Sequence, residues 1–152
     1  MPGVFEPERY MGVWYSIQHS TGGRFPDVDC VTATYDQFDP EAGTFRVQNS
    51  SSTGFEPRRN LVGSATGEGC PNGQFKVHFF GRTPTVPTYK VLDTDYDTYA
   101  VVYNCNHRKD PVPNLWFLAR TPTISEELIA KLTRETAEKL PTYDWKHAKR
   151  DV

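Results

Sequence analysis

The sequence predicts an all-β fold, an eight-stranded antiparallel up-and-down β-barrel with one C-terminal α-helix packed outside it. Three observations predict this fold. Short runs of alternating apolar and polar residues recur along the chain, and turn segments of hairpin length separate them. Only after the last run does the apolar spacing change to that of a helix. Closing eight strands into a barrel removes both sheet edges and leaves a lumen that holds side chains or one small ligand.

Eight segments carry strand patterns. The alternation is clearest over 45–49 and 75–79, where Phe and Val alternate with Arg, Gln, Lys and His, so one face of each strand is apolar and the other is polar. Gly, Pro, Asp and Asn gather at 39–43, 69–73 and 93–97, as hairpin turns require. The predicted strands are 12–20, 30–38, 44–52, 59–66, 74–81, 88–93, 98–105 and 114–121.

The segment after residue 121 predicts the helix. Apolar residues on one side of a 3.6-residue period are Ile124, Leu128, Ile129, Leu132 and Leu140. Thr123 followed by Glu126 predicts a capping box at its start, and Pro141 ends the run. Because one face is apolar, the helix is expected to pack on the barrel wall. Residues 142–147 are expected to add a short final strand.

Composition excludes several classes of protein. The 152 residues form one domain, 1–152, with 17 Lys and Arg against 19 Asp and Glu and a formal net charge of -2. No basic cluster is present for a nucleic acid. No apolar stretch approaches the roughly 20 residues that a membrane span needs. The first residues lack the pattern of a secretory signal, so we expect either a cytosolic protein or a mature chain.

Strand alternation predicts which side chains line the lumen. The inward-facing set is Val31, Ala33, Tyr35, Phe45, Val47, Asn49, Phe75, Val77, Phe79, Tyr89, Val91, Tyr99, Val101, Tyr103, Trp116 and Leu118. Such a wall, apolar with a few polar groups, is typical of small-molecule sites. The alternative is a solid core. An unpaired buried hydroxyl or amide costs about 1 to 3 kcal/mol, so Tyr35, Asn49, Tyr89 and Tyr103 favour a lumen with water or ligand.

Three separated segments carry short motifs in a recognisable order. Gly12-Val13-Trp14-Tyr15 opens the first strand, Thr94-Asp95-Tyr96 forms the turn before the seventh, and Arg120 ends the eighth. Together they resemble the three signatures of the lipocalin family, and the resemblance covers about residues 8 to 145. It is nearest to the branch with apolipoprotein D, bilin-binding proteins, crustacyanin subunits and bacterial lipocalins.

The resemblance implies a structural role for the signature residues Gly12, Trp14, Thr94, Asp95, Tyr96 and Arg120. In lipocalins the Trp plugs the closed end of the barrel, or calyx, and the Arg packs across it in a cation–π contact, so Trp14 and Arg120 are expected to meet. Positions matching Tyr35, Asn49, Phe79, Tyr89 and Trp116 line the calyx in that branch. With Val47, Val101 and Tyr103 from the alternation, they complete the expected ligand-binding set.

The resemblance also implies function. We expect binding and transport or storage of a small hydrophobic ligand, namely a bilin, carotenoid, retinoid, steroid or fatty acid. No cofactor is required, and a bound chromophore such as a bilin or carotenoid is compatible with the site. Secretion, or the periplasm in a bacterium, is expected, with a monomer or weak homo-oligomer. The alternative is a pigment-binding or partner-binding lipocalin that acts within an oligomer.

The expected mouth lies among four loops. Ligand is expected to enter between 21–29, 53–58, 82–87 and 106–113, where one arginine among Arg24, Arg58, Arg59 and Arg82 is expected to pair with a ligand carboxylate. Asn49 begins an N-glycosylation sequon, Asn49-Ser50-Ser51. Because alternation turns Asn49 into the lumen, we expect it to be unmodified.

Enzyme activity is not predicted. No Ser-His-Asp order, phosphate loop or metal-ligand spacing occurs, and His78 points outward by parity, which disfavours haem. A less favoured hypothesis is a Cys-dependent isomerase of the prostaglandin type, with Cys30 as nucleophile. The alternation turns Cys30 outward, against this role. In the related branch the positions of Cys30 and Cys105 pair with cysteines absent here, and barrel geometry separates Cys30, Cys70 and Cys105 beyond disulfide reach.

Overall fold

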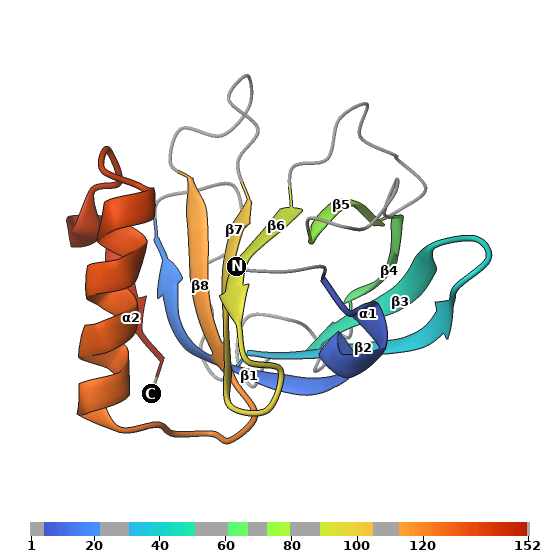
Figure 1. Cartoon of the computed structure of the whole chain (residues 1–152), viewed down its shortest axis with the longest axis horizontal. Helices are drawn as coiled ribbons and strands as arrows, with labels where there is room; N and C mark the ends of the chain where they lie inside the picture. Colours follow the sequence, from blue (N-terminus) through green and yellow to red (C-terminus); the bar gives the residue numbers. More distant parts are fainter. Residues whose placement is uncertain are drawn as a thin grey trace.

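The strands form one antiparallel sheet that closes on itself (Figure 1). The computed structural model describes residues 5–21, 31–50, 61–66, 73–79, 89–104 and 113–151. The strands are β1 (Gly12–Ser20), β2 (Thr32–Asp39), β3 (Thr44–Ser50), β4 (Leu61–Thr66), β5 (Gln74–Phe79), β6 (Tyr89–Thr94), β7 (Tyr99–Asn104), β8 (Asn114–Ala119) and β9 (Ala148–Arg150). The helices are α1 (Pro7–Tyr10), α2 (Glu126–Lys139) and the short 3₁₀-helix η1 (Trp145–His147).

Closure of the barrel runs through β1. Its first half, from Gly12 to Tyr15, pairs with β2, and its second half, to His19, pairs with β8. The remaining neighbours follow chain order from β2 to β8. This confirms the predicted barrel and its eight strands, whose ends differ from the prediction by a few residues. The final strand lies at 148–150 instead of 142–147, because η1 occupies part of the predicted range.

Two hydrophobic cores lie on opposite sides of the sheet. The inner core lies inside the barrel and contains Phe5, Tyr10, Trp14, Ala33, Tyr35, Phe45, Val47, Tyr89, Val91, Tyr96, Ala100, Val102 and Leu118. The outer core lies between α2 and the wall made by β1, β7 and β8, and contains Ile17, Val101, Leu115, Phe117, Ala119, Ile129, Leu132 and Tyr143. Figure 1 shows α2 alongside this wall.

The predicted faces of β7 are wrong. Val101 is buried in the outer core and Tyr99 and Tyr103 pack against it, whereas Ala100 and Val102 face the barrel interior. The register agrees, because Val102 lies opposite Val91 of β6 and both belong to the inner core. The reason is that α2 covers the outside of β7. Both faces of this strand are therefore covered. As a result, residues 99–103 have no polar face that would identify the outside of the barrel from the sequence.

Helix α2 begins later than its sequence pattern predicts. Ser125 is the N-cap, and its side chain accepts a hydrogen bond from the Leu128 N–H, so the predicted capping box from Thr123 is wrong. Ser and Thr are both good N-caps, so the sequence alone does not show whether Thr123 or Ser125 caps the helix. The helix ends at Lys139, before Pro141 as expected. Within the described residues, no helix is long and apolar enough to cross a bilayer.

Replacing Ser125 with alanine is expected to lower the free energy of unfolding by about 1 kcal/mol, since α2 loses the side chain that caps its first turn. Thr123→Ala is the matched control and is expected to change this free energy by less than half as much. Urea unfolding followed by circular dichroism measures both. Equal losses in the two variants would contradict the assignment of the cap.

Candidate functional site

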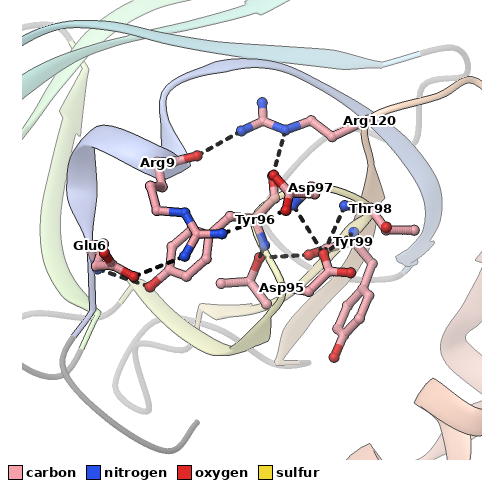
Figure 2. Close-up of polar contacts among 9 residues, drawn as sticks. Glu6, Arg9, Asp95, Tyr96, Asp97, Thr98, Tyr99 and Arg120 are labelled. Atoms are coloured by element: carbon pink, nitrogen blue, oxygen red, sulfur yellow. Dashed lines mark hydrogen bonds and ion pairs between the residues drawn. The ribbon is translucent and has the colours of Figure 1, made fainter.

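Arg120 organises one end of the barrel, which we call the capped end. Its guanidinium lies 3.7 Å from the centroid of the Trp14 ring, so the predicted contact between the two is confirmed. The guanidinium also donates hydrogen bonds to the carbonyl oxygens of Arg9, Met11, Val13 and Tyr96, at 2.9 to 3.0 Å. Figure 2 shows Arg120 reaching both Arg9 and the 95–98 turn. One side chain therefore ties α1 and β1 to the β6–β7 connection.

The 95–98 turn is held by its own side chains. Asp95 Oδ1 accepts hydrogen bonds from three backbone N–H groups, those of Asp97, Thr98 and Tyr99 (Figure 2). Partial burial alone would raise the pKa of Asp95, but these N–H groups favour its ionised form and bring the pKa below its ordinary value. Tyr96, at φ 68°, accepts the Glu6 N–H on its hydroxyl. The 95–98 turn therefore has a structural role, which is to close the capped end of the barrel.

Gly12 fits this end for two reasons. Its φ is +105°, and a Cβ built there would lie 3.0 Å from Arg120 Nη1. Gly12→Ala is therefore expected to lower the free energy of unfolding by about 2 kcal/mol, through backbone strain and displacement of the guanidinium. Chemical denaturation checks the loss. A neutral Gly12→Ala variant would contradict the close approach of Arg120 to this backbone.

Three tyrosines form a hydrogen-bonded cluster inside the barrel. The Tyr89 hydroxyl lies 2.5 Å from that of Tyr10 and 2.9 Å from that of Tyr35, and the Tyr10 and Tyr35 rings stack with centroids 5.0 Å apart. Burial raises the pKa of all three phenols, and the neighbouring hydroxyls add to the shift for Tyr89. The expectation that Tyr35 and Tyr89 need water or ligand for their hydroxyls is therefore wrong, because they are partners of each other and of Tyr10.

The predicted ligand-binding residues separate into two groups. Tyr35, Val47 and Tyr89 are buried in the inner core, and half-buried Trp116 packs against it. Asn49 lies opposite Ala33 of the inner core in the β2–β3 register, so it is on the interior face as expected. Val101 and Tyr103 are not, since they belong to the outer side beneath α2. The interior expectation is correct for five of these residues: Tyr35, Val47, Asn49, Tyr89 and Trp116.

Other predictions fall outside the described residues. The four entry loops, the three cysteines Cys30, Cys70 and Cys105, and the four arginines Arg24, Arg58, Arg59 and Arg82 lie wholly or almost wholly in undescribed segments. The backbones of Phe79 and His78 are part of β5, but their side chains are not described. Within the described residues, no group of three His, Cys, Asp or Glu side chains is close enough to hold a metal ion.

The structure joins Ser16, His19 and Asp151, which the sequence pattern does not connect. Asp151 Oδ2 accepts the Ser16 hydroxyl at 2.6 Å and lies 3.1 Å from His19 Nδ1. The His19 and Asp151 side chains are 7% and 5% exposed. Asp151 Oδ2 is therefore a partner shared by the Ser16 hydroxyl and the His19 ring. The arrangement anchors the segment after β9 to β1.

Comparisons with known proteins agree with this architecture. Residues 5–150 match the Lipocalin-like domain family. The chain is 30% identical over 135 residues to apolipoprotein D of Bos taurus, covering 84% of this chain and 67% of that protein. It is 34% identical over 143 residues to the outer membrane lipoprotein Blc of Citrobacter freundii, covering 88% of this chain and 75% of that protein.

Solved structures with the same fold have lower sequence identity. Lobster apocrustacyanin A1 matches with a TM-score of 0.69 at 18% identity, over 95% of this chain and 78% of its own. Insecticyanin from the tobacco hornworm Manduca sexta matches with a TM-score of 0.73 at 18% identity, over 97% of this chain and 80% of its own. With the closed barrel, the Trp14–Arg120 contact and a family match over residues 5–150, the chain belongs to the lipocalin family.

Proposed function

We propose that the protein carries a small hydrophobic ligand inside the barrel, between the tyrosine cluster and the end opposite the capped end. The observation that supports this most is the difference between the two ends of the inner face. At the capped end Tyr10 and Trp14 are fully buried under Arg120. Towards the other end, Trp116 and Asn49 face inward and are only half-buried.

The chemistry of this wall favours apolar ligands. The residues of its hydrophobic core are aliphatic and aromatic, and burial raises the pKa of each phenol in the tyrosine cluster, which favours the neutral form. An aromatic wall with few polar groups favours conjugated or ring-containing molecules over strongly polar ones. We propose a bilin, carotenoid, retinoid, steroid or fatty acid as the ligand. A bilin or carotenoid would be a bound chromophore and would colour the protein. We propose binding without a chemical step, which the family match and the largely apolar inner core support.

Tryptophan fluorescence tests the proposal. Ligand in the barrel is expected to quench Trp116, which faces the interior, and not Trp145, which packs against the outer core. Titration with retinoids, bilins, steroids and fatty acids should therefore show quenching that Trp116→Phe removes and the control Trp145→Phe retains. The proposal fails if no member of the panel quenches the wild type. It also fails if Trp145→Phe, and not Trp116→Phe, abolishes the signal.

Location and assembly are further parts of the proposal. A place outside the cytoplasm, secreted or periplasmic, is supported by the family and by a bacterial relative named as an outer membrane lipoprotein. A monomer or weak homo-oligomer is proposed, and the alternative is a pigment- or partner-binding role within an oligomer. Sedimentation over a range of concentrations, with and without the bound ligand, separates the two.

A further inference from the structure

Two asparagines face each other across β7 and β8 on the interior side of the barrel. Asn104 lies opposite Asn114 in the β7–β8 register and opposite Tyr89 in the β6–β7 register. Directly opposed residues of antiparallel strands share a face, and Tyr89 belongs to the inner core. Two residues along, the pair formed by Val102 and Trp116 also packs in the inner core. The two amides therefore belong to the inner face.

Both asparagines are buried, and neither amide is fully paired. Asn104 is 7% exposed and Asn114 is 1% exposed. Asn104 Oδ1 and Asn114 Nδ2 are buried atoms with no hydrogen-bond partner among the residues that the structure describes. Leaving a buried polar atom unpaired is unfavourable, and native proteins leave few such atoms without a reason. Here one acceptor and one donor are left unpaired on neighbouring strands of the same wall.

The surroundings of the pair separate it from the tyrosine cluster. The Tyr10, Tyr35 and Tyr89 hydroxyls form one hydrogen-bonded cluster, so these polar groups already have partners within the protein. Asn104 and Asn114 lie where β7 ends and β8 begins, away from the 95–98 turn and the capped end. Trp116, two residues after Asn114 on the same face, offers an aromatic surface beside the amides. Both atoms are covered in this structure, so a ligand reaches the unpaired donor and acceptor when side chains on this wall move apart.

We infer that Asn104 and Asn114 bind the polar group of an otherwise hydrophobic ligand, and that this group is a neutral one with a donor and an acceptor side by side, such as a carboxamide or lactam. Its N–H would be accepted by Asn104 Oδ1, and its carbonyl would receive the Asn114 amide N–H. The inference rests on the proposed carrier function and names its ligand class.

Other polar groups match the pair less well. A carboxylate only accepts hydrogen bonds, so it would place an anion against Asn104 Oδ1 and leave that oxygen unpaired. An ester also only accepts, and a hydrocarbon leaves both amides unpaired. An amide pairs both atoms at once, and each hydrogen bond to a buried, otherwise unpaired group changes affinity by about tenfold. Among ligands with the same hydrocarbon chain, this site is therefore expected to prefer the amide over the ester and the carboxylate.

The test uses three ligands with the same chain, namely oleamide, methyl oleate and oleate. Wild-type protein is expected to bind oleamide about tenfold more tightly than either of the others, measured by tryptophan quenching. In Asn104→Leu and Asn114→Leu this preference is expected to fall to within about twofold. Gln48→Leu is the matched control, because it removes an amide from the outer face of β3 and should keep the wild-type preference.

The outcomes distinguish the inference from the carrier function. If the wild type binds all three ligands equally, or if the Leu variants keep the preference for oleamide, the inference is overturned and the carrier function stands. If none of the three binds and the wider panel also fails, both are overturned. Circular dichroism checks folding, and the Leu variants should retain the wild-type midpoint because they remove unpaired polar atoms. Asn104→Ala and Asn114→Ala repeat the test if leucine does not fit.

Discussion

Arg120→Met is expected to lower the free energy of unfolding by about 3 kcal/mol. The variant keeps a long apolar stem but removes the donors to four backbone carbonyl oxygens and the cation over the Trp14 ring. A hydrogen bond from a charged group contributes about 1.5 to 3 kcal/mol, and a cation–π contact adds about 1 kcal/mol. Arg120 is half-buried, so water can hydrogen-bond some of the carbonyl groups that the variant leaves unpaired. The expected loss is therefore smaller than the sum of these contributions.

The matched control for this variant is Arg150→Met. Arg150 also makes several bonds, to both carboxylate oxygens of Glu126 and to Gln18, but its side chain is 47% exposed and that of Glu126 is 78% exposed. Exposed ion pairs contribute little, so a much smaller loss is expected. Urea unfolding followed by Trp fluorescence compares the two. Similar losses would mean that Arg120 is no more important to this fold than a surface arginine.

The features predicted best from the sequence are those coded by neighbouring residues. Strand positions follow from alternation and from turn residues, and both signals span only a few positions. The sequence therefore predicts β1 from Gly12 to Ser20, as the structure has it. The Trp14–Arg120 contact joins residues far apart in the chain. It was predicted only because the motifs resemble a known family, and no periodicity in this sequence encodes it.

The features predicted worst depend on tertiary contacts. Alternation predicts an interior position for Val101 and Tyr103, but in β7 it cannot distinguish a face covered by α2 from a face that lines the barrel. Tyr10 precedes β1 in a four-residue helix, so no strand pattern places its hydroxyl beside Tyr35 and Tyr89. Asn104 and Asn114 lie at strand ends, where asparagine is common because it favours turns. Only their burial in the folded protein distinguishes them from ordinary turn residues.

Tyr89→Phe is expected to reduce stability at neutral pH and to lose that disadvantage at high pH. Near pH 7 the variant removes the central hydroxyl of the tyrosine cluster, which bonds both Tyr10 and Tyr35, and this lowers the free energy of unfolding by about 1 to 2 kcal/mol. The volume of the ring is kept, so no cavity contributes to the loss. Urea unfolding near neutral pH measures this first effect.

The second effect follows from the pKa of the Tyr89 phenol, which burial and the Tyr10 and Tyr35 hydroxyls raise well above that of an exposed tyrosine. The unfolded phenol ionises near pH 10, so above about pH 10 the native state of the wild type holds a proton that the unfolded state has lost. Its contribution to stability is complete below that pH and is lost as pH rises towards the folded pKa, by about 1.4 kcal/mol per pH unit. Phenylalanine cannot ionise, so the variant escapes this loss, and the two proteins should be equally stable by about pH 11. A difference that stays constant from neutral to alkaline pH would show that the Tyr89 hydroxyl is not held protonated by the barrel.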